Sequence, residues 1–249
     1  MIGRSTWTAL VVAGSAVVLG AASCSVDNRQ LLATSDSAGT ASFGNAGAGG
    51  RLGAGDGGDS NQPGPLPLCD YSVGVDSGCD TLVDNPGFTK DVYGWTPEDA
   101  TVTMTWTNND SASSKKSGSM AVVNALFGEA DGTAARGAAQ CFATSVGRSY
   151  SFGLDMFIPE GQGDGPDGAK YSGNAGLSIL FFTDAECAGY TLSSATSGVV
   201  DETGSWQHRE GRAVTPEGAR SMSVRLVTFK NFREYSFEAR FDNVLLRAD

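Results

Sequence analysis

Residues 150–159 read YSFGLDMFIP, and this stretch gives the clearest indication of the fold. Its large apolar side chains fall on every second residue, which is the spacing of a strand with one buried face. Other stretches show the same alternation, and clusters of Gly, Asp, Asn and Ser separate them, which is typical of strands joined by turns. These further stretches cover residues 101–108, 175–184, 219–229 and 235–247.

The region that carries this pattern begins near Cys69 and runs to Asp249. It contains no convincing amphipathic helix of ten or more residues and no evident internal repeat. Its length allows eight or nine strands, which are expected to pack in two layers. We therefore predict an all-β domain over residues 69–249, a two-sheet antiparallel β-sandwich of the jelly-roll type.

The chain before this domain has two different compositions. Arg4 precedes an apolar run over residues 9–20, which is shorter than the roughly 20 residues that a membrane-spanning helix needs. This pattern predicts a signal peptide over residues 1–23. Residues 24–68 are rich in Gly, Ala and Ser and poor in apolar side chains, which is typical of a flexible linker.

Cys24 follows the small residues Ala21, Ala22 and Ser23, and this stretch resembles the lipobox of bacterial lipoproteins. The resemblance implies cleavage before Cys24 and a lipid anchor on its thiol. Several acyl chains would hold the protein stably on the cell envelope, at the outer membrane or cell surface, whereas one chain is marginal. The alternative is an ordinary secretory signal that leaves Cys24 as a free thiol.

The number of cysteines agrees with lipidation of Cys24. The chain has five cysteines, and a lipid on Cys24 leaves an even set of four. Three pairings of that set are possible, and an exported protein is expected to form disulfides. The spacing favours Cys69 with Cys79, which leaves Cys141 with Cys187. Because no CxxC pair is present, the cysteines do not indicate a zinc site.

The charge of the chain disfavours two kinds of partner. A formal net charge of -11 repels the phosphates of nucleic acids and of anionic lipids. We therefore expect no nucleic-acid partner, and a membrane link through the lipid anchor only. The chain has one histidine, His208, so a two-histidine metal site cannot form within it. A lone histidine in a strand is expected to be structural or solvent-facing.

The order of motifs along residues 82–247 carries a family resemblance. The motifs are LVDNPGFTKDVYGWT at 82–96, SGSMAVVN at 117–124, AQCFATSVGRSYSFGLDMFI at 139–158, LSILFFTDAECAGY at 177–190, GSWQHREGRAVTPEGARSMSVRLV at 204–227 and FEARFDNVLLR at 237–247. Together they resemble a carbohydrate-binding module with the galactose-binding-like jelly-roll fold, of the kind found beside bacterial xylanases and glucanases. Many members have a bridge like Cys141–Cys187. Trp206 is expected to pack in the core.

The resemblance implies a polysaccharide or cell-envelope glycan as the ligand, bound on the concave sheet by aromatic and polar side chains. If Phe152, Leu154 and Met156 point inward, Asp155 and Phe157 point outward. A register slip of one residue would invert this set. The same alternation exposes the remaining candidates, which are Phe182, Arg225, Phe229, Glu238 and Arg240.

The resemblance also implies a structural calcium ion, held by the first strand and by an Asp near the last. Asp242 matches the acidic position, whereas Thr89 stands where Glu usually follows the Phe of the first strand. Calcium takes about six to eight oxygen ligands, so the missing carboxylate weakens this expectation. Asp242 is the candidate ligand. The acidic loop over residues 160–168, with Asp164 and Asp167, lacks EF-hand spacing and is expected to be a solvated loop.

These observations favour a non-catalytic carbohydrate-binding module that a lipid anchor displays on the cell envelope. One alternative is an envelope lipoprotein with a structural role or with a protein partner. The other is an enzyme of the glycoside hydrolase type, since two carboxylates suffice for that chemistry. No pair of acidic residues in the sequence stands at a defined spacing that would indicate such a site.

Overall fold

The computed structural model describes residues 81–249 apart from Asp167. The predicted signal peptide, Cys24, the linker and the Cys69–Cys79 pair lie outside the described residues. The described part consists of strands, turns and loops, and none of it forms a helix that could cross a membrane.

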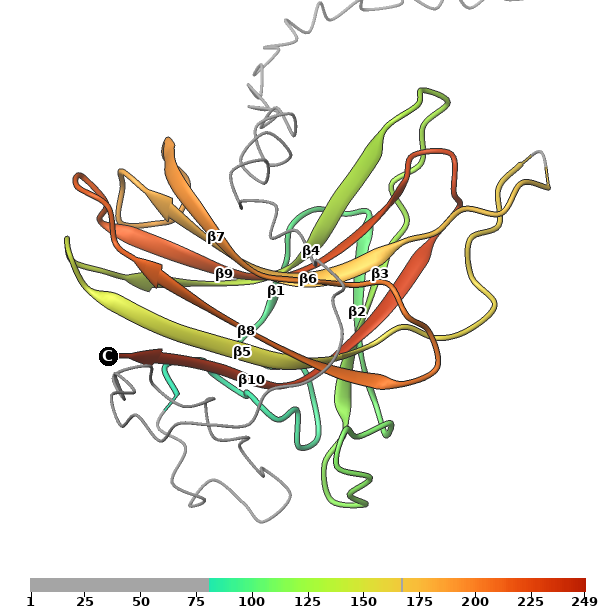
Figure 1. Cartoon of the computed structure of the whole chain (residues 1–249), viewed down its shortest axis with the longest axis horizontal. Coiled ribbons are helices and arrows are strands. Elements are labelled where there is room, and N and C mark those ends of the chain that lie inside the picture. The colour runs from blue at the N-terminus through green and yellow to red at the C-terminus, as the bar shows by residue number, and fades with distance from the viewer. Residues whose placement is uncertain (1–80, 167) are drawn as a thin grey trace, which may run out of the picture. The chain divides into compact units, whose positions relative to one another are not determined.

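Ten strands form two antiparallel five-stranded sheets (Figure 1), which confirms the predicted sandwich. Sheet A has the order β1-β4-β9-β6-β7, and sheet B has the order β2-β3-β10-β5-β8. The strands are β1 (Thr96–Pro97), β2 (Val102–Thr107), β3 (Ser119–Asn124), β4 (Thr133–Ala143), β5 (Ser149–Phe157), β6 (Asn174–Phe182), β7 (Thr191–Val200), β8 (Trp206–Val214), β9 (Ser221–Asn231) and β10 (Phe237–Ala248).

The chain changes sheet at most of its connections. Strands β3, β4, β5 and β6 alternate between sheets B and A, and β8, β9 and β10 alternate again. This path wraps the strands around one core, as in a jelly roll. The ten strands exceed the expected eight or nine, and the shortest of them, β1, has two residues.

The core lies between the sheets and contains the residues that the alternation predicts. Phe152, Leu154 and Met156 of β5 are fully buried. They face side chains of sheet A such as Ile179 and Leu226, which are also fully buried. The prediction for the inward face of β5 is therefore confirmed.

The segment before β1 closes the sandwich on the side of the C-terminal strand. The backbone N–H of Leu82 donates to the carbonyl of Leu246 at 2.8 Å. Phe88 and Trp95 are both buried, and their ring centroids lie 6.0 Å apart. These contacts tie the first described residues to β10.

A disulfide joins Cys141 of β4 to Cys187 in the loop between β6 and β7, with 6.0 Å between the Cα atoms. This bond confirms the predicted second pair. Cys187 also donates its backbone N–H to the Ser221 hydroxyl of β9 at 3.1 Å. The disulfide and this hydrogen bond together hold the loop over residues 183–190 against sheet A.

Sheet A is strongly curved. In Figure 1, β4 and β7 rise on the two sides of β9 and β6, so the outward side of sheet A is concave. We call this side the concave face. The outward side of sheet B lies on the opposite surface of the sandwich.

Candidate functional site

The predicted ligand-binding residues divide between these two surfaces. Phe182, Arg225 and Phe229 belong to β6 and β9 of sheet A, whereas Asp155, Phe157, Glu238 and Arg240 belong to β5 and β10 of sheet B. Strand alternation separates inward from outward side chains, but it does not say which sheet a strand joins. The seven residues therefore do not form one site.

The floor of the concave face, between β4 and β7, includes two glycines. Around Val227 of β9, the register places Gly137 of β4 on one side and Gly176 of β6 on the other. A Cβ atom at Gly137 would come within 1.9 Å of the Leu226 carbonyl oxygen, so this position excludes any side chain. The backbones of β4 and β9 therefore approach closely at this position, and only glycine fits there.

Arg225 stands on this floor and is fixed by an ion pair. Its Nε donates to one carboxylate oxygen of Glu98, and the other oxygen accepts the Gly137 backbone N–H at 2.9 Å. The Arg225 and Glu98 side chains are 13% and 17% exposed. Within the described residues no hydrogen bond comes from the two terminal nitrogens of Arg225, so both remain available to a ligand.

Two buried polar atoms on the same face have no hydrogen-bond partner among the described residues. They are Oγ of Ser178, which lies opposite Arg225, and Oδ1 of Asn174, which lies opposite Phe229. Buried polar atoms are nearly always hydrogen-bonded in folded proteins. Both atoms are covered in the structure, so they are unsatisfied polar groups within the floor of this face.

Phe229 supplies an aromatic ring beside Asn174 on this face. A Cβ atom at Gly176 would lie 3.8 Å from the ring, so the ring packs beside this glycine. Its side chain is only partly buried. The concave face therefore brings a ring, a guanidinium and two unpartnered polar atoms together.

A cavity of about 350 Å³ opens at the β1 edge of the concave face. It forms because β1 pairs only with Ala138 and Ala139, which leaves the rest of that edge of β4 uncovered. Its lining combines Glu98 with residues of the segment before β1, of β1, of β4, of β9 and of the disulfide: Asp84, Gly94, Thr96, Pro97, Ala139, Gln140, Cys141, Phe142, Cys187 and Ser223.

The expected exposure of Phe182 is wrong. Phe182 faces outward from β6, but it is only 8% exposed. It pairs in register with Ser221, whose hydroxyl accepts the Cys187 backbone N–H. The disulfide-tied loop over residues 183–190 therefore passes across this end of the concave face, which removes Phe182 from the list of accessible ligand contacts.

The outer face of sheet B carries a different set of side chains. The register aligns Arg240 of β10, Phe157 of β5 and Trp206 of β8 in one row. The Phe157 and Trp206 ring centroids lie 5.5 Å apart, and the Arg240 guanidinium carbon lies 5.5 Å from the Phe157 centroid. Arg240 Nε donates to Glu238 at 2.8 Å. Trp206 is thus partly exposed on this face, and the prediction that it packs in the core is wrong.

The next row of this face contains His208, which the sequence left without a function. Its Nδ1 lies 2.8 Å from an Asp155 oxygen, and its Nε2 lies 3.2 Å from a Glu210 oxygen. The hydrogen bond with Asp155 raises the pKa of His208. Burial acts to raise the pKa of Asp155, but hydrogen bonds from His208, Asn243 and Ser111 outweigh burial and hold it below its usual value.

This row lacks the geometry of nucleophilic catalysis. The nearby hydroxyl of Ser111 donates to Asp155 and not to His208. Both ring nitrogens of His208 are engaged by carboxylates. In a Ser-His-Asp triad the serine hydroxyl donates to an imidazole nitrogen, so these residues form a polar cluster and not such a triad.

Asp242, the candidate calcium ligand, is buried beside this row. Its two oxygens accept the backbone N–H groups of Ser111 at 3.0 Å and of Asn243 at 2.8 Å. Burial raises the pKa of Asp242 to about 7, and Asp110 adds to the shift. Among residues 81–249, leaving out Asp167, no three His, Cys, Asp or Glu side chains converge as a metal site. Any calcium here would take most of its ligands from carbonyl groups and water.

Comparison with known proteins yields similar structures and no sequence relatives. No family model and no curated protein matches the sequence. Tailspike protein 4 of bacteriophage CBA120 has a TM-score of 0.48 at 16% identity, over 68% of this chain and 21% of the phage chain. The chain thus spans about a fifth of that protein.

Two smaller proteins match over most of their length. The CBM22-1 xylan-binding domain of Paenibacillus barcinonensis Xyn10C has a TM-score of 0.44 at 13% identity, over 65% of this chain and 90% of that domain. A cyclase from Fischerella sp. TAU has a TM-score of 0.45 at 13% identity, over 68% and 96% of the two chains. These likenesses assign the chain to no family.

Proposed function

We propose that this domain is a non-catalytic carbohydrate-binding module, which binds a polysaccharide or cell-envelope glycan on the concave face of sheet A. The observation that carries the proposal is the grouping of Phe229, Arg225, Ser178 and Asn174 on one curved surface. A sugar ring has an apolar side that stacks on an aromatic ring and hydroxyl groups that need hydrogen-bond partners. The concave face offers both kinds of contact.

Preorganisation adds to the case. Glu98 holds Arg225 in one orientation before any ligand arrives, so less side-chain entropy is lost when the terminal nitrogens donate to sugar hydroxyls. The cavity of about 350 Å³ at the β1 edge extends the concave face and lies in the size range of small-ligand sites.

The module is proposed to be displayed on the cell envelope. The signal peptide over residues 1–23 would direct export, Cys24 would carry the lipid, and residues 24–68 would hold the domain away from the membrane. Metabolic labelling with a radioactive fatty acid tests the anchor. Incorporation that is lost in Cys24→Ser supports it, and an unlabelled wild-type protein refutes it.

A structural calcium ion at Asp242 is proposed separately. Its test is the melting temperature of the full chain with calcium chloride and with a chelator. A rise with calcium that Asp242→Ala abolishes supports the ion. Identical melting temperatures in the two buffers refute the proposed calcium ion.

Affinity electrophoresis tests the main proposal. The full chain is run through gels that contain xylan, a soluble β-glucan, a galactan or isolated envelope polysaccharide. We expect retardation in at least one gel, which Phe229→Ala and Arg225→Met reduce. Val146→Ala serves as the control, because Val146 is an exposed apolar residue in the turn between β4 and β5.

The outcomes separate the alternatives. Absence of retardation in every gel refutes glycan binding and leaves the protein-partner alternative, which pull-down from envelope extracts then tests. Release of reducing ends from a polysaccharide would instead indicate an enzyme. Retardation that is undiminished in both concave-face variants refutes the placement of the site.

A further inference from the structure

We propose that the outer face of sheet B is a second binding surface, separate from the concave face, and that it takes an uncharged polysaccharide chain. This surface is defined by Trp206, Phe157, Arg240, Glu238, His208 and Asp155. All six project from the side of β5, β8 and β10 that faces away from the core. The proposal does not require that the concave face binds a ligand.

The aromatic pair is the first reason. Trp206 and Phe157 are directly opposite each other across β8 and β5, with ring centroids 5.5 Å apart and planes at 44°. Both side chains remain partly exposed. Tryptophan is among the residues that contribute most at binding surfaces, because its ring offers a large apolar area at a low entropic cost. Nothing among the described residues covers this pair completely.

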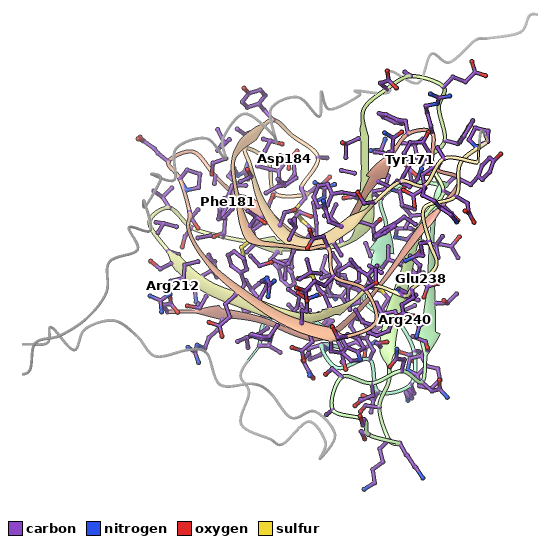
Figure 2. All side chains as sticks on the ribbon, turned by 45° about the vertical axis from the view of Figure 1, so that its right-hand side comes forward. Tyr171, Phe181, Asp184, Arg212, Glu238 and Arg240 are labelled. Carbon is purple, nitrogen blue, oxygen red and sulfur yellow. A yellow bond between two sulfur atoms is a disulfide. The ribbon has the colours of Figure 1, made fainter. Side chains whose placement is uncertain are left out.

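The polar groups on both sides of the rings are the second reason. Along β10, Arg240 and Glu238 form a pair with a distance of 2.8 Å, and the two side chains lie close together at one end of the sandwich in Figure 2. Along β8, His208 follows Trp206 by two residues and is bound to Asp155. Strand geometry puts this second pair about 7 Å from the ring row.

These two pairs are already ordered by their own hydrogen bonds. Glu238 is fixed further because its backbone N–H donates to Gln162 at 2.6 Å and its carbonyl accepts from Gln162 at 2.9 Å. Asp155 accepts from both Ser111 and Asn243. A ligand with hydroxyl groups would meet donors and acceptors in fixed positions beside an apolar platform, which is the arrangement that a sugar chain requires.

Charge selects the class of glycan. The surface presents the carboxylates of Asp155 and Glu238, with Glu210 beyond His208, and these offset the guanidinium of Arg240 and, further along the face, those of Arg212 and Arg247. The whole chain adds a net charge of -11. A polysaccharide with carboxylate or sulfate groups would be repelled, so an uncharged chain is the expected ligand.

Two opposite surfaces have a consequence that one surface lacks. Each face can hold a different polysaccharide chain, so a single domain can link two chains, whereas one short oligosaccharide cannot occupy both faces together. Linking is expected to raise the apparent affinity for long chains above that for oligosaccharides.

The test uses the full chain in affinity gels that contain a soluble β-glucan, xylan, galactan or polygalacturonate. Trp206→Ala is compared with Val214→Ala, a matched control because Val214 is an exposed residue on the same face at the other end of β8. Both are also combined with Arg225→Met, which disables the concave face. Trp206→Tyr keeps an aromatic ring and serves as the rescue, and thermal melts confirm that each variant is folded.

We expect residual binding of the Arg225→Met protein to an uncharged glycan, weakened about tenfold or more by adding Trp206→Ala and restored by Trp206→Tyr. If Arg225→Met alone abolishes all binding, the second surface is refuted and the concave face stands. If Trp206→Ala alone abolishes it, the second surface stands and the concave site is refuted. Retention in no gel refutes both, and stronger retention by polygalacturonate than by uncharged glycans refutes the ligand class.

Discussion

The ion pair between Arg225 and Glu98 gives the sharpest test of how the concave face is built. Replacing Arg225 with Met removes the guanidinium but keeps an unbranched apolar side chain on β9. Glu98 then loses its cation while its other oxygen stays bound to the Gly137 N–H. The carboxylate is only 17% exposed, so water restores little of the lost interaction.

The stability that is lost when this ion pair is broken lies between two known limits. Exposed ion pairs contribute about 0–1 kcal/mol, whereas breaking a fully buried pair costs about 3–5 kcal/mol. Side chains that are 13% and 17% exposed stand between these cases, so Arg225→Met is expected to reduce the free energy of unfolding by about 1–3 kcal/mol. Adding Glu98→Gln removes the carboxylate charge that has lost its partner. The double variant should therefore lose less stability than the sum of the losses in the two single variants.

Urea unfolding of the full chain, followed by tryptophan fluorescence, measures these values. Arg212→Met is the matched control, because Arg212 is exposed on sheet B and its loss should change stability by no more than about 0.5 kcal/mol. A coupling energy of about 0.5 kcal/mol or more between Arg225 and Glu98 would agree with the structure. Additive single variants, or an Arg225→Met protein as stable as the control, would show that the pair is not formed.

Three further predictions concern the scaffold. Replacing Cys141 and Cys187 with Ser removes a bridge across 46 residues, and should cost about 4 kcal/mol in the chain-entropy model; an unchanged calorimetric melting temperature would contradict this. Burial raises the pKa of Glu234 to about 7 from 4.5, so the folded state keeps a proton that the unfolded chain releases. Stability should therefore fall as the pH rises from about 4.5 to 7, and less steeply in Glu234→Gln; equal slopes in urea unfolding would refute the shift. Phe181→Ala should lose about 3–5 kcal/mol because Phe181 is fully buried, whereas Tyr190→Ala should lose about 0.5 kcal/mol or less, and similar losses would contradict the assigned core.

Alternation along single strands predicted much of this fold. The inward set on β5, with Phe152 and Met156, and the facing set on β9, with Val224, are buried as expected. The period of two is a local property, because successive side chains point to opposite sides of any strand. Strand β7 was missed because it is an edge strand with mostly small polar side chains, such as Ser193 and Thr196, and shows no apolar alternation.

The alternation along each strand could not predict which outward residues share a surface. Arg225 and Arg240 both face outward, but their strands belong to different sheets, and sheet membership depends on long-range pairing. Trp206 was assigned to the core because of its size, yet β8 is an edge strand and its register with Phe157 turns the ring outward. Phe182 is covered by a loop that the Cys187 disulfide holds in place, and loop paths of this kind leave no periodic signal.

The main proposal is that the concave face binds a glycan. Its most direct test is a titration of the ¹⁵N-labelled full chain with an oligosaccharide of the polysaccharide that retards it most in gels. If the concave face binds the glycan, the backbone amide shifts of Gly176, Ser178 and Ser223 move with ligand concentration, and Arg225→Met abolishes these changes. Amide shifts that stay constant at these three positions, while the gel still retains the protein, would contradict the claim.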